Sequence, residues 1–206
     1  MNPLSTIKGT IIAGVVLAIV IAILVAVFAK TGIAFNSLSF IIWLHVLAGI
    51  TWIGLLYYFN FVQTPALAAA AKDQGGPGGA GINKYVAPRA LLWFRWGAVF
   101  TWLTGVTYLG HIGLLTDAFT LGLGPRGTLP GTYIGIGAWL GTIMLFNVWV
   151  LIWPNQKRVL GLVESTAEQI AKARRVAFLA SRTNTLLSIP MLMSMVSFGH
   201  AGFFIN

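Results

Sequence analysis

The stretch IIAGVVLAIVIAILVAVFA, residues 11–29, decides the class of fold because it is continuously apolar and carries no charge. A helix that crosses a bilayer needs about 20 such residues. The apolar core of a cleaved secretory signal is shorter, at about 7–15 residues. The run therefore predicts a retained transmembrane helix that follows Lys8.

The rest of the chain has the same character, with 57% hydrophobic and only 8% charged residues. Soluble domains carry about 25% charged residues. We predict an all-α integral membrane protein, one domain over residues 1–206, in which the second to fifth segments form a four-helix bundle of the haem-binding type. The five expected transmembrane helices lie at about 10–31, 39–62, 88–113, 131–153 and 180–204.

The basic residues give the orientation of the chain. The side facing the expected outer loops carries only Lys30 and Arg126, whereas the opposite side carries Lys8, Lys72, Lys84, Arg89, Lys157, Arg158, Lys172, Arg174, Arg175 and Arg182. Cytoplasmic loops are the ones enriched in Lys and Arg. We expect a bacterial inner-membrane protein with its N-terminus in the cytoplasm and its C-terminus in the periplasm. The net charge of +9 then reflects topology, and no nucleic-acid partner is expected.

Residues 164–177, ESTAEQIAKARRVA, form a basic amphipathic pattern on the cytoplasmic side. Such a helix rests on anionic headgroups, so membrane lipid is an expected partner, and a docking site for another protein is the alternative. The absence of cysteine excludes disulfides, an iron–sulfur cluster and a covalently attached c-type haem within these residues.

The three histidines, His45, His111 and His200, are the candidate cofactor ligands. Each lies about six residues from the outer end of a different apolar segment, which corresponds to a depth of about 9 Å. Ionisable residues inside membranes commonly mark functional sites. Two of the three can ligate one haem iron, and the third is left to bind a propionate, to transfer protons or to be a satisfied interfacial residue.

Glycines near these histidines favour a flat macrocycle over a bare metal ion. Gly49 lies one turn from His45, and the fourth segment, which has no histidine, carries Gly137 and Gly141. Small residues let a porphyrin approach the backbone, although they also allow close helix packing. We therefore predict haem b, with three-histidine zinc or copper as the alternative.

A second polar group is expected in the cytoplasmic half, where it can bind an anionic planar molecule or a quinone. Gln63 follows His45 by 18 residues, which places both on one face of an ideal helix. Arg182 shares the face of His200 by the same argument, with Pro190 between them, and Asn184 adjoins it. Ordinary interfacial anchoring and helix–helix hydrogen bonds are the alternative explanation.

Four stretches, in order, resemble the membrane domain of the bacterial PuuD-type urate hydroxylase (urate oxidase) family. They are WLHVLAGITWIGLLYYFNFVQTP at 43–65, ALLWFRWGAVFTWLTGV at 90–106, WPNQKRVLG at 153–161 and ASRTNTLLSIPMLMSM at 180–195. The resemblance implies a haem-bearing bundle and urate oxidation, with electrons passing to a C-terminal cytochrome c domain. Because these residues contain no cysteine, that domain is not expected here, and the electrons would leave to a partner subunit or an outer-face cytochrome.

Three functions follow from these observations. The first is a haem b electron-transfer subunit of a redox or respiratory complex. The second, implied by the resemblance, is a urate-oxidising enzyme with a separate electron acceptor. The third is a structural accessory subunit that packs against a larger membrane complex without a redox role.

Overall fold

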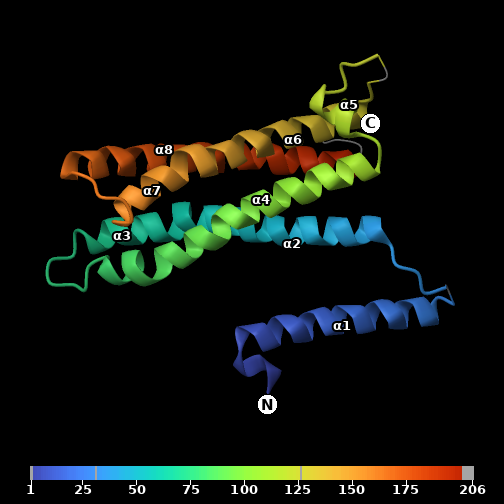
Figure 1. The fold of residues 1–206 in the computed structure, drawn as a ribbon, viewed down its shortest axis with the longest axis horizontal. Helices are drawn as coiled ribbons and strands as arrows, with labels where there is room; N and C mark the ends of the chain where they lie inside the picture. Colours follow the sequence, from blue (N-terminus) through green and yellow to red (C-terminus); the bar gives the residue numbers. More distant parts are fainter. Residues whose placement is uncertain (1, 31, 126, 201–206) are drawn as a thin grey trace. The chain divides into compact units, whose positions relative to one another are not determined.

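The computed structural model describes residues 2–30, 32–125 and 127–200, and their regular structure is helical throughout, with no strand among them (Figure 1). The chain divides into two compact units, Met1–Ser37 and Leu38–Asn206. Each unit is described by itself. The all-helical class expected from the sequence is thereby confirmed for the described residues.

The first unit is built around one apolar helix. After the short 3-10 turn η1 (Pro3–Ser5), Thr6 caps α1 (Ile7–Phe28) by accepting a hydrogen bond from the N–H of Gly9 at 3.0 Å. No residue of α1 is buried, although its side chains are apolar on all sides. Such a helix suits lipid or a protein partner rather than water. The helix begins three residues earlier than the expected 10–31, and residue 31 lies outside the described residues.

The second unit contains the long helices α2 (Ser37–Tyr57), α4 (Ala87–His111), α6 (Leu129–Phe146) and α8 (Ala167–Gly199). Figure 1 shows them side by side, each running opposite to the one before it. Shorter helices complete the unit: α3 (Thr64–Ala70), α5 (Leu115–Phe119) and α7 (Trp153–Val159).

Three π-helical turns interrupt the helices, and each ends two residues before a proline. The N–H that follows each turn donates a hydrogen bond to the carbonyl oxygen five residues earlier. The pairs are Thr64 to Phe59, Ala87 to Ile82 and Trp153 to Val148. Proline has no N–H, and its ring clashes with the carbonyl four residues earlier, so a wider turn relieves the clash. The turns are η2 (Tyr58–Gln63), η3 (Ile82–Val86) and η4 (Asn147–Ile152), before Pro65, Pro88 and Pro154.

Three helical stretches among the described residues are long and apolar enough to cross a membrane: Ile7–Phe28, Ser37–Ala70 and Leu129–Val159. They coincide with the first, second and fourth expected segments. The third expected segment, 88–113, coincides with α4. These lengths and compositions fit a membrane protein.

The end of the chain differs from the expected pair of helices at 164–177 and 180–204. The structure has one continuous helix, α8, which runs through Pro190. Thr166 and Gln169 form a capping box that starts it, with hydrogen bonds of 3.3 and 3.0 Å. No glycine or proline separates the two expected helices, so nothing ends the first. Residues 201–204 of the expected segment lie outside the described residues.

Buried amides link the helices at mid-length. Asn184 of α8 is fully buried; it accepts a hydrogen bond from Asn147 Nδ2 at 2.8 Å and donates to Met144 O at 3.0 Å. Asn60 donates to Leu56 O and to Ser181 Oγ, both at 2.8 Å. Between apolar helices, such satisfied amides fix the register of the packed elements.

Candidate functional site

A cavity of about 330 Å³ lies among α2, α4, α6 and α8. We call it the histidine cavity, because His45 is the one histidine in its lining. Apolar and small side chains make most of the wall, with Gly137 and Gly141 from α6 and Met191 and Met195 from α8. An apolar cavity with one imidazole suits an apolar ligand that needs a single strong donor atom.

The ring of His45 is held in one tautomer by α4. Its Nδ1 lies 2.9 Å from Thr101 O and 3.1 Å from Thr104 Oγ1. A carbonyl oxygen only accepts, and Thr104 gives its own proton to Phe100 O at 2.6 Å, so both partners are acceptors. Nδ1 therefore carries the hydrogen, and Nε2 of the neutral ring keeps its lone pair.

Gly105 makes the space in which this ring lies. A Cβ at Gly105 would be 3.1 Å from His45 Cε1, closer than ordinary contact. The α4 helix thus supplies the two hydrogen-bond acceptors and the gap for the ring from residues within one turn of each other.

The glycines expected to face a macrocycle have different surroundings. A Cβ at Gly141 would meet no atom within 4 Å, so this residue borders open space in the histidine cavity. A Cβ at Gly137 would lie 2.9 Å from Met195 Cε, so its missing side chain accommodates that methionine. Gly49 faces α4, with Thr101 Cγ2 3.9 Å from the Cβ position, and lies outside the lining.

His111 and His200 do not join His45. Both are exposed at the ends of their helices, and neither lines the cavity. His200 Nδ1 lies 3.0 Å from Val196 O of its own helix. Within the described part of the chain, no three His, Cys, Asp or Glu side chains converge as a metal site. The structure thus brings only His45, of the three candidate ligands, to this cavity.

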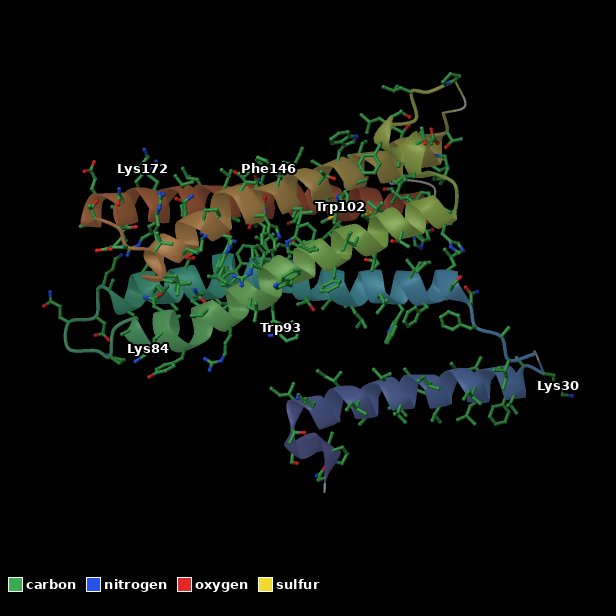
Figure 2. The ribbon with its side chains drawn as sticks, viewed as in Figure 1. Lys30, Lys84, Trp93, Trp102, Phe146 and Lys172 are labelled. Atoms are coloured by element: carbon green, nitrogen blue, oxygen red, sulfur yellow. The ribbon has the colours of Figure 1, made fainter. Side chains whose placement is uncertain are left out.

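The exposed large apolar side chains that line the histidine cavity come from α2 and α8. Ile42 and Val46 are 41% and 49% exposed, and Leu192 and Val196 are 40% and 50% exposed. Trp102 links α4 to α6 at the cavity, where its Nε1 donates to Thr142 Oγ1 at 2.9 Å (Figure 2).

A second cavity, of about 840 Å³, lies at the other end of the same helices. We call it the arginine cavity, after Arg174 and Arg175 of α8. Its floor is apolar and includes Phe59 and Phe94, and its lining contains no Asp or Glu. In Figure 2, Lys84 and Lys172 mark this end of the unit.

Of the three residues predicted for the polar site, Gln63 lines the arginine cavity. Its Oε1 atom is buried and has no hydrogen-bond partner. Gln156 and Asn83 add two further amides to the lining. Because an unpaired buried polar atom is costly, a polar ligand or water is expected beside it.

Most of the second unit matches a known protein family. Residues 32–121 and 126–205 match the urate oxidase N-terminal family. The chain belongs to this family. No curated protein and no solved structure matches it.

Both cavities of this urate oxidase N-terminal chain lie inside the matched residues, whereas α1 precedes them. The resemblance inferred from the sequence motifs is thereby confirmed. The match shows which family the chain belongs to. The chemistry of each cavity has to be argued from the residues that line it, because a shared fold does not fix the reaction.

Two expected residues lie outside the arginine cavity. Arg182 is exposed, with its guanidinium carbon 5.3 Å from the Phe178 ring centre, and Asn184 is occupied by the buried amide pair. Arg174 and Arg175 take the place expected for Arg182. Sequence reasoning had placed them on a lipid-facing helix. The signal that identifies them is helical spacing: Arg174 precedes the lining positions Phe178 and Ser181 by four and seven residues, and Arg175 precedes Phe178 by three.

Proposed function

We propose that this chain is a membrane electron-transfer protein that holds one haem b in the histidine cavity. The observation that carries the proposal is His45, whose Nδ1 is bonded to Thr101 O and whose ring lines a dry cavity. Haem ligation needs a neutral imidazole with a free Nε2 and a partner that orients the ring. Bound haem b supplies a one-electron carrier.

The imidazole and the apolar wall of the cavity are the features that support such a group. Open space beside Gly141 and the apolar wall provide room and a low dielectric, which together with the axial ligands set the potential of a haem. Exposed apolar side chains of α2 and α8 border the cavity, as expected of a site for a lipid-soluble group. The protein itself would bind the haem, orient it and exclude water from it.

The proposal includes a topology. All five long helices span a bacterial inner membrane, with α2, α4, α6 and α8 forming the four-helix bundle and the N-terminus in the cytoplasm. The support is the excess of Lys and Arg at the N-terminus and at the loops near the arginine cavity. The histidine cavity then lies toward the periplasm, where a partner subunit or a cytochrome can accept electrons.

The decisive test is a reduced-minus-oxidised visible spectrum of the purified full chain, with extraction and quantitation of haem. We expect a b-type spectrum at about one haem per chain, in keeping with one cavity of this kind. His45→Ala should abolish it. A purified, folded wild-type chain without extractable haem would overturn the proposal.

A second function is favoured by the arginine cavity. Family membership and a lining of amides and two arginines, with no acid, support urate as a substrate that binds as an anion. Electrons would pass to the haem and then to an external acceptor. The test is urate consumption by the purified chain with an artificial acceptor present, and no consumption by a haem-loaded chain would exclude this candidate.

A further inference from the structure

We infer that Arg95, Trp153 and Lys157 form a binding site for the phosphate group of an anionic phospholipid, on the surface between α4 and α7. None of the three lines either cavity, so the inference goes beyond the proposed function and needs neither haem nor urate. It takes from that proposal only the topology, which places this end of the helices at the cytoplasmic leaflet.

Two cations lie against the ring of one tryptophan. The guanidinium carbon of Arg95 is 3.7 Å from the centre of the Trp153 ring, and Nζ of Lys157 is 6.0 Å from it. Both distances are within the range of cation–π attraction. Trp153 and Lys157 are four residues apart on α7 and so share one face, whereas Arg95 comes from α4. The packing of Trp96 edge to face on Trp149, at 5.6 Å between ring centres, joins the two helical stretches beside this group.

The positive charge of this group has no counterpart in the protein. Within the described part of the chain, neither the Arg95 guanidinium nor the Lys157 ammonium has a hydrogen bond or an ion pair. Arginine has five N–H donors and lysine has three. Both side chains are partly buried, which makes unpaired donors costly. An anion with several oxygens, such as a phosphate, would accept these hydrogen bonds, and a guanidinium binds phosphate with two parallel ones.

In the proposed topology, the group lies at the depth of lipid headgroups. Trp153 and Lys157 fall in the last two turns of the apolar stretch Leu129–Val159, and tryptophan is enriched at that level of a membrane. Arg95 lies eight residues inside α4, about 12 Å from its start at Ala87. Its long side chain ends at Trp153, near the end of the neighbouring stretch, as arginine does when its charge extends toward the membrane surface.

Apolar side chains continue from the charged group toward the middle of α4, which favours a lipid over a free phosphate. Trp96 follows Arg95 and is 45% exposed; Phe100 and Leu103, four and seven residues after Trp96, are 55% and 47% exposed. This spacing puts the three on one face of α4. Trp96 and Phe100 are in contact, with ring centres 6.2 Å apart. An acyl chain can lie along this strip while the phosphate is bound at its end.

The test is native mass spectrometry of the purified full chain with equimolar phosphatidylglycerol and phosphatidylcholine of the same acyl length. We expect the wild type to retain one phosphatidylglycerol in preference to phosphatidylcholine. Arg95→Gln and Lys157→Gln should each weaken this preference about 10-fold, the loss expected for a charged hydrogen bond. Arg182→Gln is the matched control, since it removes the same charge from a single cation–aromatic contact, 5.3 Å from the centre of the Phe178 ring.

Arg95→Lys provides a second variant that keeps the charge. Because lysine has no planar fork for phosphate, its affinity for phosphatidylglycerol should lie between those of the wild type and Arg95→Gln. Equal lipid preference in the wild type and Arg95→Gln, or an equal loss in Arg182→Gln, would overturn the site. So would displacement of the lipid by inorganic phosphate, which would show that the site takes the free anion. Haem content is measured on the same samples: a haem-free chain that still selects phosphatidylglycerol overturns only the proposed function.

Discussion

The histidine cavity and the arginine cavity are built from the same helices and have opposite chemistry. The first is lined by residues 101–109 of α4 and 191–198 of α8, and the second by residues 87–94 and 171–181. The packed side chains of Leu56 and Met144, both fully buried, belong to the core between these levels. One end is dry with one imidazole, and the other carries amides and two cations.

If the proposed haem and anion occupy these cavities, one helical scaffold separates an electron carrier from a polar ligand. A dry end strengthens every electrostatic interaction made with a bound group. A polar end with amides, one of which (Gln63) has an unpartnered oxygen, and with two cations can exchange a water-soluble anion. If the two ends have these separate roles, substitutions at one cavity should leave the ligand of the other in place.

The largest effect is expected at His45. His45→Ala should remove haem from the purified chain almost completely, because the cavity loses its only imidazole. Urate binding at the arginine cavity should remain. The measurement is the ratio of haem to protein beside urate binding by calorimetry, with His111→Ala as the control that retains haem. Loss of both ligands in His45→Ala would mean that the cavities are not independent.

The converse substitution is the double change Arg174→Ala and Arg175→Ala. It should lower urate affinity about 10- to 100-fold, the range expected when charge-assisted hydrogen bonds are lost, and leave haem content unchanged. Arg182→Ala is the matched control on the same helix, since Arg182 is exposed outside the lining. An equal loss of affinity in the control would assign the effect to the general positive charge.

Hydrophobic length predicted where the helices lie. The expected segments 39–62, 88–113 and 131–153 match α2 with η2, α4, and α6 with η4 within a few residues. Apolar length is a property of the sequence that burial in lipid or in a core uses directly. The continuity of α8 was not predicted: helices were expected at 164–177 and 180–204, but no glycine or proline separates them and the structure has one helix, Ala167–Gly199.

The directions of side chains were harder to predict. Gln63 was placed on the face of His45 by counting 100° per residue, but η2 lies between them and has more residues per turn. The two residues line different cavities. The depth of His111 and His200 stays a prediction from segment ends, whereas the direction of their side chains depends on packing that one sequence does not specify.

A smaller effect is expected at Gly105, which makes room for the His45 ring. Gly105→Ala should weaken haem affinity about 10-fold, a typical cost of disturbing the support of a ligand, because the new methyl would press on Cε1 from 3.1 Å. Gly110→Ala is the control: it adds the same methyl to the same helix with no atom within 4 Å. Haem titration of both variants measures the difference, and equal affinities would show that the ring has room to move.

The smallest effect is expected at Thr104, the second acceptor for His45 Nδ1 at 3.1 Å. Thr104→Val removes this acceptor and keeps the shape of the side chain, while Thr101 O at 2.9 Å still fixes the tautomer. We therefore expect a loss of haem affinity of only about 3-fold, below the cost of losing a sole supporting partner. The midpoint potential should also rise, since the imidazolate character of the ligand decreases when one acceptor is removed.

Thr107→Val is the matched control, because its hydroxyl bonds only to Leu103 O at 2.8 Å, one turn away. If Thr104→Val instead abolished haem binding, the hydroxyl and not the Thr101 carbonyl would be the group that orients His45, and the dry end would depend on a side chain rather than on the backbone of α4.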